Sequence, residues 1–294
     1  MSATCALVGV HAPYRASPAR HASAHKAVRG RVVTCAAAVS EKTDLPIAIV
    51  TGGAKGIGAA CCTLLATQGW AVMVNHRKSS AQEAESLVER IRESGGEAMV
   101  HCADVGVEED VVAMFDAAHK WGLVKGLVNN AGILLGPNKS KLVEDASADD
   151  LVKIMRVNVV GPVLCTREAL RVMSAKKGNT GGAIVNISSG SAVIGRPLLY
   201  AASKGALNSF QAGAVEELAG HGIRINAVSP GMTNTDLVKD VVPIFDFSKI
   251  PLGRIGEPEE IAQTVNFLLS EKSAYTTGAN IRVAGGRAPG NFLG

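Results

Sequence analysis

Short apolar runs alternate with longer amphipathic segments from Leu45 onward. A run of about four to eight apolar residues between turn residues is typical of a strand that is buried on both faces. Such runs predict strands at Ile47–Thr51, Ala71–Asn75, Glu97–Ala103, Gly126–Asn130, Ala183–Ser188, Ile223–Val228 and Ala279–Val283. The amphipathic segments between them predict helices that begin near Gly56, Ser80, Glu108, Ala148, Tyr200 and Glu257.

Strands that alternate with helices predict the α/β class, here a single doubly wound Rossmann domain with a seven-stranded parallel sheet flanked by helices. No linker rich in Pro, Gly or charge divides residues 45–286, so this range is expected to be one domain, followed by a tail at 287–294. The longest irregular stretch is Pro230–Gly256. A loop of that length in a compact domain usually has a function, such as a lid over an active site.

The charge of the chain is unevenly distributed. The net charge is +4, but the first 40 residues contain five basic residues and no acidic one. The remainder has 25 basic and 26 acidic residues, a net charge of −1, so nothing in the body of the chain favours a nucleic-acid partner. No apolar run reaches the roughly 18–20 residues that a membrane span requires. We therefore expect neither nucleic acid nor membrane among the partners.

Residues 1–40 have the composition of an organelle transit peptide. They are rich in Ala, Ser, Arg and His and lack the continuous apolar core of a secretory signal. The stretch RVVTCAAAVS resembles a chloroplast processing region, with cleavage expected between Cys35 and Ala38. This predicts the chloroplast stroma before the mitochondrion; a disordered cytosolic tail is the alternative. The six cysteines have neither disulfide-scaffold nor zinc-site spacing, and no metal site is expected.

A glycine-rich turn, TGGAKGIG, connects the first predicted strand to an apolar helix. Glycines in such a turn let the backbone approach a pyrophosphate, and the helix N-terminus offers unpaired N–H groups to it. A strand before the turn and a helix after it are the context that a dinucleotide-binding site requires. The turn residues expected to hold the cofactor are Gly52, Lys55, Gly56, Ile57 and Gly58.

The end of the second strand indicates which cofactor is bound. NAD enzymes of this fold usually place an acid there, which binds the ribose 2′-hydroxyl. This chain has Asn75, followed by Arg77 and Lys78, and Lys55 is a further cation within reach. Cations without an acid favour the 2′-phosphate of NADP(H); the alternative is that these are solvated residues at a helix start. Asp104 and Val105 follow the third strand, where Asp104 is expected either to bind adenine or to cap a helix.

Four further motifs follow in order: NNAG with Asn130, Ala131 and Gly132, VNVVG around Asn158, ISSGSAVIGRPLLYAASK ending at Lys204, and VSPG with Pro230 and Gly231. Together with the glycine turn, they make residues 45–286 resemble the short-chain dehydrogenase/reductase family. The resemblance implies a catalytic tetrad, a nicotinamide site and a homodimer or homotetramer. The tetrad residues are Asn158, Ser189, Tyr200 and Lys204.

Tyr200 and Lys204 are four residues apart, so a helix places them on one face. A neighbouring ammonium favours the phenolate, and we expect it to lower the tyrosine pKa toward neutrality. The resemblance implies that Tyr200 protonates the nascent alkoxide, that Ser189 hydrogen-bonds the same oxygen, and that Lys204 holds the nicotinamide ribose. Asn158 keeps a relay water in place. Taken singly, each residue also has an ordinary structural explanation, for Asn158 a backbone contact at a helix irregularity.

The chain departs from the family in two places. Ser189 precedes Tyr200 by 11 positions, about two fewer than is common, so Ser188 is the fallback for the catalytic serine. The chain is also similar to 3-oxoacyl-acyl-carrier-protein reductases, whose bacterial members use two arginines to dock the acidic carrier protein. Leu164 and Glu216 fall at those positions, with Arg167 near the first, and an acid there weakens such docking.

The predicted function is an NADP(H)-dependent oxidoreductase that reduces a ketone or aldehyde to an alcohol. Plastid 3-oxoacyl-acyl-carrier-protein reduction, polyol or sugar dehydrogenation, and a catalytically silent NADP(H)-binding sensor or scaffold are the alternatives. The backbone of Met232 and the hydroxyl of Thr233 or Thr235 are expected to meet the nicotinamide carboxamide. Apolar residues at Pro197–Leu199 and Val241–Phe247 suggest a hydrophobic or amphipathic substrate, although core or interface positions would give the same pattern.

Overall fold

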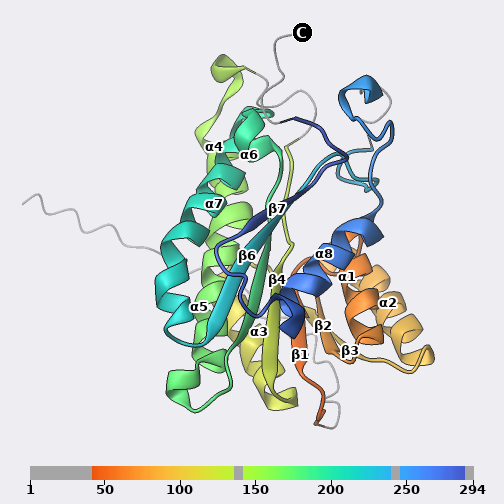
Figure 1. The fold of residues 1–294 in the computed structure, drawn as a ribbon, viewed down its shortest axis with the longest axis vertical. Coiled ribbons are helices and arrows are strands. Elements are labelled where there is room, and N and C mark those ends of the chain that lie inside the picture. Colours follow the sequence, from red (N-terminus) through yellow and green to blue (C-terminus); the bar gives the residue numbers. More distant parts are fainter. Residues whose placement is uncertain (1–41, 136–141, 240–245, 289–294) are drawn as a thin grey trace, which may run out of the picture. The chain divides into compact units, whose positions relative to one another are not determined.

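The computed structural model describes residues 42–135, 142–239 and 246–288. Its centre is a parallel sheet with the strand order β3-β2-β1-β4-β5-β6-β7 (Figure 1). The seven predicted strands are all present, and each boundary lies within two residues of its expected position. Their bounds are β1 Ile47–Val50, β2 Ala71–His76, β3 Glu97–Cys102, β4 Val124–Asn129, β5 Gly182–Ile187, β6 Ile223–Pro230 and β7 Asn280–Val283. The prediction of a doubly wound, seven-stranded parallel sheet is confirmed.

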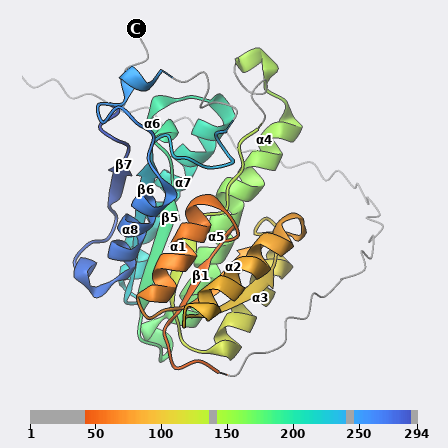
Figure 2. The same cartoon turned by 90° about the vertical axis from the view of Figure 1, so that its right-hand side faces the viewer.

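Helices cover both faces of this sheet (Figure 2). One face carries α1 Gly56–Thr67, α2 Ala81–Glu93 and α8 Pro258–Leu269. The other carries α3 Glu108–Trp121, α5 Gly161–Met173 and α7 Leu198–Ala219. The remaining helical pieces are α4 Ala148–Met155, α6 Ser191–Ile194 and the 3-10 turns Lys78–Ser80, Val143–Asp145, Ala175–Lys177, Phe247–Lys249 and Glu271–Ser273.

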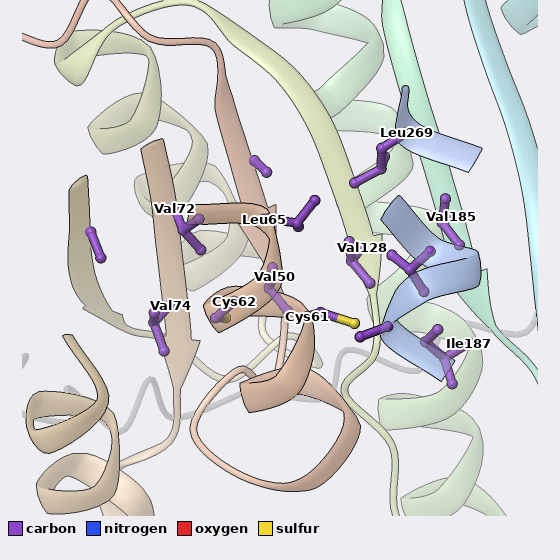
Figure 3. Close-up of a cluster of buried hydrophobic side chains, with 14 of the residues drawn as sticks. Val50, Cys61, Cys62, Leu65, Val72, Val74, Val128, Val185, Ile187 and Leu269 are labelled. Atoms are coloured by element: carbon purple, nitrogen blue, oxygen red, sulfur yellow. The ribbon is translucent and has the colours of Figure 1, made fainter. Parts of the chain in front are cut away.

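The period-two alternation of the strands divides the core between the two faces. Ala48 and Val50 of β1 point toward α1 and α8, whereas Ile47 and Ile49 point toward α3 and α5. Figure 3 shows the first of these clusters, in which Leu65 of α1 and Leu269 of α8 meet the strand valines. Since every β1 side chain is fully buried, the strand reads as a continuous apolar run, which is why the sequence pattern predicts it.

The chain order places a crevice between β1 and β4. From β1 the sheet grows through β2 to β3, and the chain then crosses back to β4 on the other side of β1. In open α/β sheets, ligands bind at the carboxyl ends of the strands where the order reverses. The glycine turn follows β1 and the NNAG motif follows β4, so both lie at this point.

The helix expected from Ala148 is interrupted. Residues Arg156–Val160 form a π-helical turn between α4 and α5, and Pro162 lies in the first turn of α5. Pro162 lacks an N–H, which costs nothing at a helix start, so the chain resumes a regular helix there. The short α6 is a further element that the sequence pattern does not predict.

Several predictions concern residues beyond the described ones. The predicted transit peptide at 1–40 and most of the tail at 287–294 lie outside the described residues, as do residues 241–245 of the apolar loop segment. Within the described ranges, no helix has the length and apolar character needed to cross a membrane.

Candidate active site

The glycine turn is fixed from below by the ends of β1 and β4. The hydroxyl of Thr51 accepts hydrogen bonds from the backbone N–H groups of Asn130 and Ala131, each at 3.0 Å. The amide of Asn130 donates to the carbonyl oxygens of Thr51 and Gly52 at 2.9 and 3.0 Å. Gly52 has a φ of +62°, which a residue with a Cβ rarely adopts. The NNAG motif therefore holds the glycine turn in place through these hydrogen bonds.

A groove of about 380 Å³ runs along this turn. Twelve of the residues predicted to bind the cofactor line it: Gly52, Lys55, Gly56, Ile57, Asn75, Arg77, Asp104, Val105, Asn130, Ala131, Gly132 and Thr235. Lys78 is exposed and outside the lining, and Gly58 lies beneath the turn. A Cβ at Gly58 would lie 2.4 Å from the carbonyl oxygen of Gly52, so only glycine permits this approach.

Asn75 is oriented differently from its predicted role. Its side-chain oxygen accepts a hydrogen bond from the N–H of Gly52 at 3.1 Å, and its amide donates to the carbonyl of Ala103 at 3.1 Å. β2 continues for one residue beyond the predicted end, to His76. Asn75 therefore joins the glycine turn to the end of β3 and is 2% exposed, and the side chains that can select a cofactor come after it.

Two of the predicted cations stand at the mouth of the groove. Arg77 is exposed and follows β2 directly. The ammonium of Lys55 lies 2.6 Å from a carboxylate oxygen of Glu83 on α2, and this hydrogen bond raises the pKa of Lys55. Both side chains are about half exposed, so water screens the ion pair and it is weak. A phosphate arriving at the groove can therefore compete with Glu83 for Lys55.

Asp104 shapes the opposite wall of the groove. Its carboxylate accepts a hydrogen bond from the N–H of Gly106 at 2.9 Å, whereas Val107 is the N-cap residue of α3 and has no capping side chain. Asp104 is therefore not the N-cap residue of α3, which was the alternative prediction for it. The carboxylate of Asp110, in the first turn of α3, accepts a hydrogen bond from the N–H of Asp104 at 2.9 Å.

A second cavity, of about 410 Å³, adjoins the groove and is lined by three of the four predicted catalytic residues, whereas Asn158 is buried behind it. It shares Ile57, Asn130, Gly132, Thr235 and Leu237 with the groove. Ser189, Tyr200 and Lys204 line it, and so do the residues predicted beside nicotinamide, namely Pro230, Gly231, Met232, Thr233 and Thr235. Of Pro197–Leu199, only Pro197 is among its lining residues.

The shortened loop still brings Ser189 to Tyr200, with a hydrogen bond between their hydroxyl groups. The backbone after β5 remains paired with β6, since Ser188 N–H donates to Val228 O at 2.8 Å and Gly190 N–H to Pro230 O at 3.1 Å. Ser188, the fallback, points elsewhere: its hydroxyl donates to Asn208 at 2.6 Å. The structure thus selects Ser189 as the serine that faces Tyr200.

Tyr200 and Lys204 lie on one face of α7, with the Lys204 Nζ 5.7 Å from the centre of the Tyr200 ring. Burial raises the pKa of Tyr200 to about 12, while its hydrogen bond with Ser189 acts in the opposite direction. Burial lowers the pKa of Lys204 to about 8. The direction for Tyr200 is opposite to the prediction, because the loss of hydration dominates. The ammonium of Lys204 donates to the carbonyl of Ile187 at 2.7 Å.

Asn158 sits in the π-helical turn and is fully buried. Its side-chain oxygen accepts from the N–H of Ile133 at 2.8 Å, and its amide donates to Ile133 O and to the hydroxyl of Ser203, both at 3.0 Å. Ser203 in turn donates to the carbonyl of Tyr200 at 2.7 Å. A Cβ on Gly132 would lie 3.5 Å from the Lys204 Nζ and 3.6 Å from the Asn158 side-chain oxygen. Asn158 therefore connects the chain after NNAG to the first turns of α7.

Three arginines that the sequence reasoning missed also line the cavity: Arg196, Arg282 and Arg287. They come from the loop between α6 and α7, from β7, and from the turn after β7. Since the carboxyl ends of parallel strands meet at one edge of a sheet, a basic residue near the end of the last strand was an available signal.

Comparison with known proteins identifies the family. The sequence profile described as enoyl-(acyl carrier protein) reductase matches residues 52–288. An uncharacterized oxidoreductase, YgfF of Escherichia coli (strain K12), is 42% identical over 83% of this chain and 100% of its own length. A 3-oxoacyl-[acyl-carrier-protein] reductase of Synechocystis sp. is 35% identical over 82% of this chain and 96% of its own length.

A third relative is a cis-4-hydroxycyclohexanecarboxylate dehydrogenase of Sinomonas cyclohexanicum, which is 36% identical over 82% of this chain and 95% of its own length. The chain belongs to the enoyl-(acyl carrier protein) reductase family of short-chain dehydrogenases/reductases. It is therefore an oxidoreductase of a family whose enzymes use nicotinamide cofactors.

Proposed function

We propose that this member of the short-chain dehydrogenase/reductase family is an NADPH-dependent reductase of a ketone or aldehyde, with Tyr200 as the general acid. The observation that carries the proposal is one cavity, lined by Ser189, Tyr200 and Lys204, that opens onto the glycine-turn groove. A silent binding protein would need the groove but not this arrangement of a phenol, a hydroxyl and an ammonium.

The residues present fit a dinucleotide. A Cβ on Gly52 would meet Ala131 at 3.0 Å and one on Gly56 would meet Thr235 at 3.1 Å, so the glycines keep a cradle open beside the N-terminus of α1. Gly52–Ile57 would hold the pyrophosphate, and the residues around Gly231–Thr235 would hold the nicotinamide ring. NADPH supplies the hydride when it is bound.

The side chains of the cavity can supply the proton and stabilise the developing charge. With a pKa of about 12, Tyr200 is protonated at neutral pH, which is the form that a general acid needs. The hydroxyl of Ser189 would donate to the carbonyl oxygen of the substrate, where negative charge develops. Lys204, with a pKa of about 8, is still mostly protonated at neutral pH and can replace the proton that Tyr200 gives up.

Preference for NADPH rests on the charges around the groove mouth. Arg77 and Lys55 are the cations that line the groove and can reach a 2′-phosphate, while Glu83 competes for Lys55. Replacing Arg77 with Gln should weaken NADPH binding about tenfold or more and leave NADH binding nearly unchanged, since charged hydrogen bonds contribute about 1.5–3 kcal/mol. Glu83→Gln should act in the opposite direction. Equal affinity for the two cofactors in the unmodified protein would contradict the proposal.

The decisive experiment measures NADPH oxidation by residues 41–294 with ketones, aldehydes, sugars and 3-oxoacyl thioesters. Tyr200→Phe removes the acidic hydroxyl and keeps the ring, so its activity should fall by about 100-fold or more. Ser188→Ala is the matched control, because Ser188 hydrogen-bonds Asn208 rather than Tyr200. Activity that survives in Tyr200→Phe would rule out the proposed acid.

Reduction of a carrier-bound 3-oxoacyl chain, the activity that the name of the Synechocystis relative describes, is the second candidate. The residues at the positions where bacterial reductases dock the carrier protein give this candidate little support. Arg167 is tied to Glu108 and Glu168 at 2.6 Å each, and Glu216 is exposed on α7. The Sinomonas relative is named for a hydroxy carboxylate, which adds a further compound to the panel. A carrier-protein thioester that is reduced better than its coenzyme A counterpart would favour the second candidate.

We also propose import of residues 1–40 into the chloroplast and assembly into a homodimer or homotetramer. The leader composition supports the first proposal, and a fluorescent fusion with and without residues 1–40 tests it. Exposed apolar residues on α4 and the π-helical turn support the second: Leu151, Val152 and Val160. Light scattering after size-exclusion chromatography gives the mass in solution.

A further inference from the structure

Around the reacting groups, the cavity has an unusual balance of charge. Its described lining residues include four cationic side chains, Lys204, Arg196, Arg282 and Arg287, and no Asp or Glu. Much of the remaining lining is apolar and includes Ile187, Ile194, Pro197 and Met232. A cavity with excess positive charge and apolar walls repels cations and gives a neutral polar substrate little to bind.

The arginine positions are set by the end of β7. Arg282 points toward the turn that follows the strand, and its guanidinium donates to the carbonyl of Arg287 at 2.5 Å. Gly285 and Gly286 have φ values of +59° and +84°, and the N–H of Arg287 donates to the carbonyl of Ala284 at 3.1 Å. The turn at Gly285 and Gly286 therefore folds Arg287 back toward Arg282, and both arginines line the cavity.

This turn is held firmly against the residues beside the predicted nicotinamide site. The N–H of Gly231 donates to the carbonyl of Val283 at 2.8 Å, and a Cβ on Gly231 would lie 2.8 Å from the Cα of Ala284. The N–H of Leu252 donates to the carbonyl of Gly285 at 3.1 Å. The position of the arginine pair is thus coupled to the catalytic side of the cavity.

The two guanidinium groups are close enough to influence each other. Burial, and to a lesser extent the charge of Arg282, lowers the pKa of Arg287. Like charges held near each other attract an anion more strongly than either charge alone. A guanidinium has five N–H donors, so each arginine can keep its contacts within the protein and still bind a carboxylate or phosphate.

We propose that the carbonyl substrate carries an anionic group, a carboxylate or a phosphate ester, which Arg282 and Arg287 bind while the carbonyl faces Tyr200. Arg196, on the loop before α7, borders the same cavity and adds to the attraction. The proposal rests on the reductase function proposed above and names the class of compound on which that function acts. It makes the arginine pair a determinant of specificity and assigns it no part in proton transfer.

The test compares matched substrates that differ in charge. One pair is 4-formylbenzoate and its methyl ester; the other is glyceraldehyde 3-phosphate and glyceraldehyde. We expect kcat/KM with NADPH to be at least about tenfold higher for the anionic member of one or both pairs, mainly through a lower KM. The pair that shows the preference distinguishes a carboxylate from a phosphate. Equal kcat/KM values within both pairs would overturn the proposal.

Variants then assign the effect to the arginines. Arg282→Gln and Arg287→Gln should each reduce kcat/KM for the anionic substrate about 10- to 100-fold and change it less than about twofold for the neutral one. Arg287→Lys, which keeps the charge, should retain a larger share. Arg90→Gln, an exposed arginine on α2 outside the cavity, is the matched control. An equal loss for both substrates would indicate a structural defect and contradict the proposal.

A binding measurement separates this proposal from the reductase function. Calorimetric titration with benzoate and with benzamide requires no turnover, and benzoate should bind to the unmodified protein more tightly than to Arg282→Gln. If benzoate shows this preference and no carbonyl is reduced, the proposed function fails and the anion site stands. If carbonyls are reduced and neither benzoate nor phenyl phosphate, titrated in the same way, binds better than benzamide, the reductase stands and the anion site is wrong.

Discussion

Gly58→Ala tests whether the glycine turn depends on close packing beneath it. Gly58 lies in the first turn of α1, where alanine is intrinsically better than glycine by about 0.8–1.0 kcal/mol. The new Cβ, however, would lie 2.4 Å from the carbonyl oxygen of Gly52 and 2.6 Å from the amide nitrogen of Asn130. Those two atoms are themselves joined by a 3.0 Å hydrogen bond. The methyl group therefore has to displace both partners of one bond.

The two effects have opposite signs, and the clash should be the larger. Overpacking of a rigid site costs about 1–3 kcal/mol, to which the lost hydrogen bond adds about 1 kcal/mol. Against a gain of about 1 kcal/mol from helix propensity, the net destabilisation should be about 1–3 kcal/mol. In a domain of this size that lowers the melting temperature by about 2–12 °C. Since the displaced carbonyl belongs to the groove wall, NADPH affinity should fall about tenfold or more.

Gly213→Ala provides the control for helix propensity alone. Gly213 lies inside α7 and is exposed, and a Cβ added there would meet nothing within 4 Å, so alanine should raise stability by up to about 1 kcal/mol. Differential scanning calorimetry gives both melting temperatures, and NADPH fluorescence gives the affinities. A Gly58→Ala protein that melts as high as Gly213→Ala and keeps its NADPH affinity would refute the reasoning.

Three further results are expected. Asn158→Ala removes three hydrogen bonds of a buried side chain and leaves the N–H of Ile133 without its partner, so urea unfolding should show a loss of about 2–4 kcal/mol. A loss below about 0.5 kcal/mol would contradict this positioning role. NADPH at 100 times its Kd should stabilise the protein by about 2.7 kcal/mol, and the same concentration of NADH by clearly less; equal thermal shifts would contradict the cofactor preference. For a neutral substrate, kcat/KM for reduction should fall as pH rises through about 8, because Lys204 loses its proton there, and a profile that stays flat to pH 10 would exclude this dependence.

The sequence was sufficient for the sheet and for the order of the site residues. The strands are buried on both faces and so appear as uninterrupted apolar runs, and the i,i+4 spacing places Tyr200 and Lys204 on one face of α7. It was insufficient for the end of β2. The side chain of Asn75 accepts from the N–H of Gly52 and donates to the carbonyl of Ala103, two backbone groups that only the folded chain brings to the end of β2.

Two further features depend on tertiary structure that the pattern does not contain. The π-helical turn at Arg156–Val160 keeps a helical appearance in sequence, so an irregularity there was expected only as the alternative explanation of Asn158, and the division between α4 and α5 was not predicted. The pKa of Tyr200 depends on how much water surrounds the hydroxyl, and its spacing from Lys204 carries no information on that. Likewise, Arg196, Arg282 and Arg287 come from three separate segments, and only the folded chain places them around one cavity.

The depressed pKa of Lys204 and the arginine-lined cavity together predict a shift that depends on substrate charge. Burial lowers the pKa of Lys204 to about 8 in the free protein. A bound anion favours the charged form of a nearby amine and so raises its pKa. The pH dependence of kcat reports the enzyme–substrate complex, whereas that of kcat/KM reports the free enzyme. The alkaline fall in kcat should therefore occur at higher pH with 4-formylbenzoate than with its methyl ester, while the fall in kcat/KM occurs at the same pH for both. Arg287→Gln should raise KM for the acid and leave the difference in kcat profiles at saturating substrate, because the anionic group is present in every enzyme–substrate complex. Identical kcat profiles for the acid and the ester would show that the anionic group, wherever it binds, does not act on Lys204.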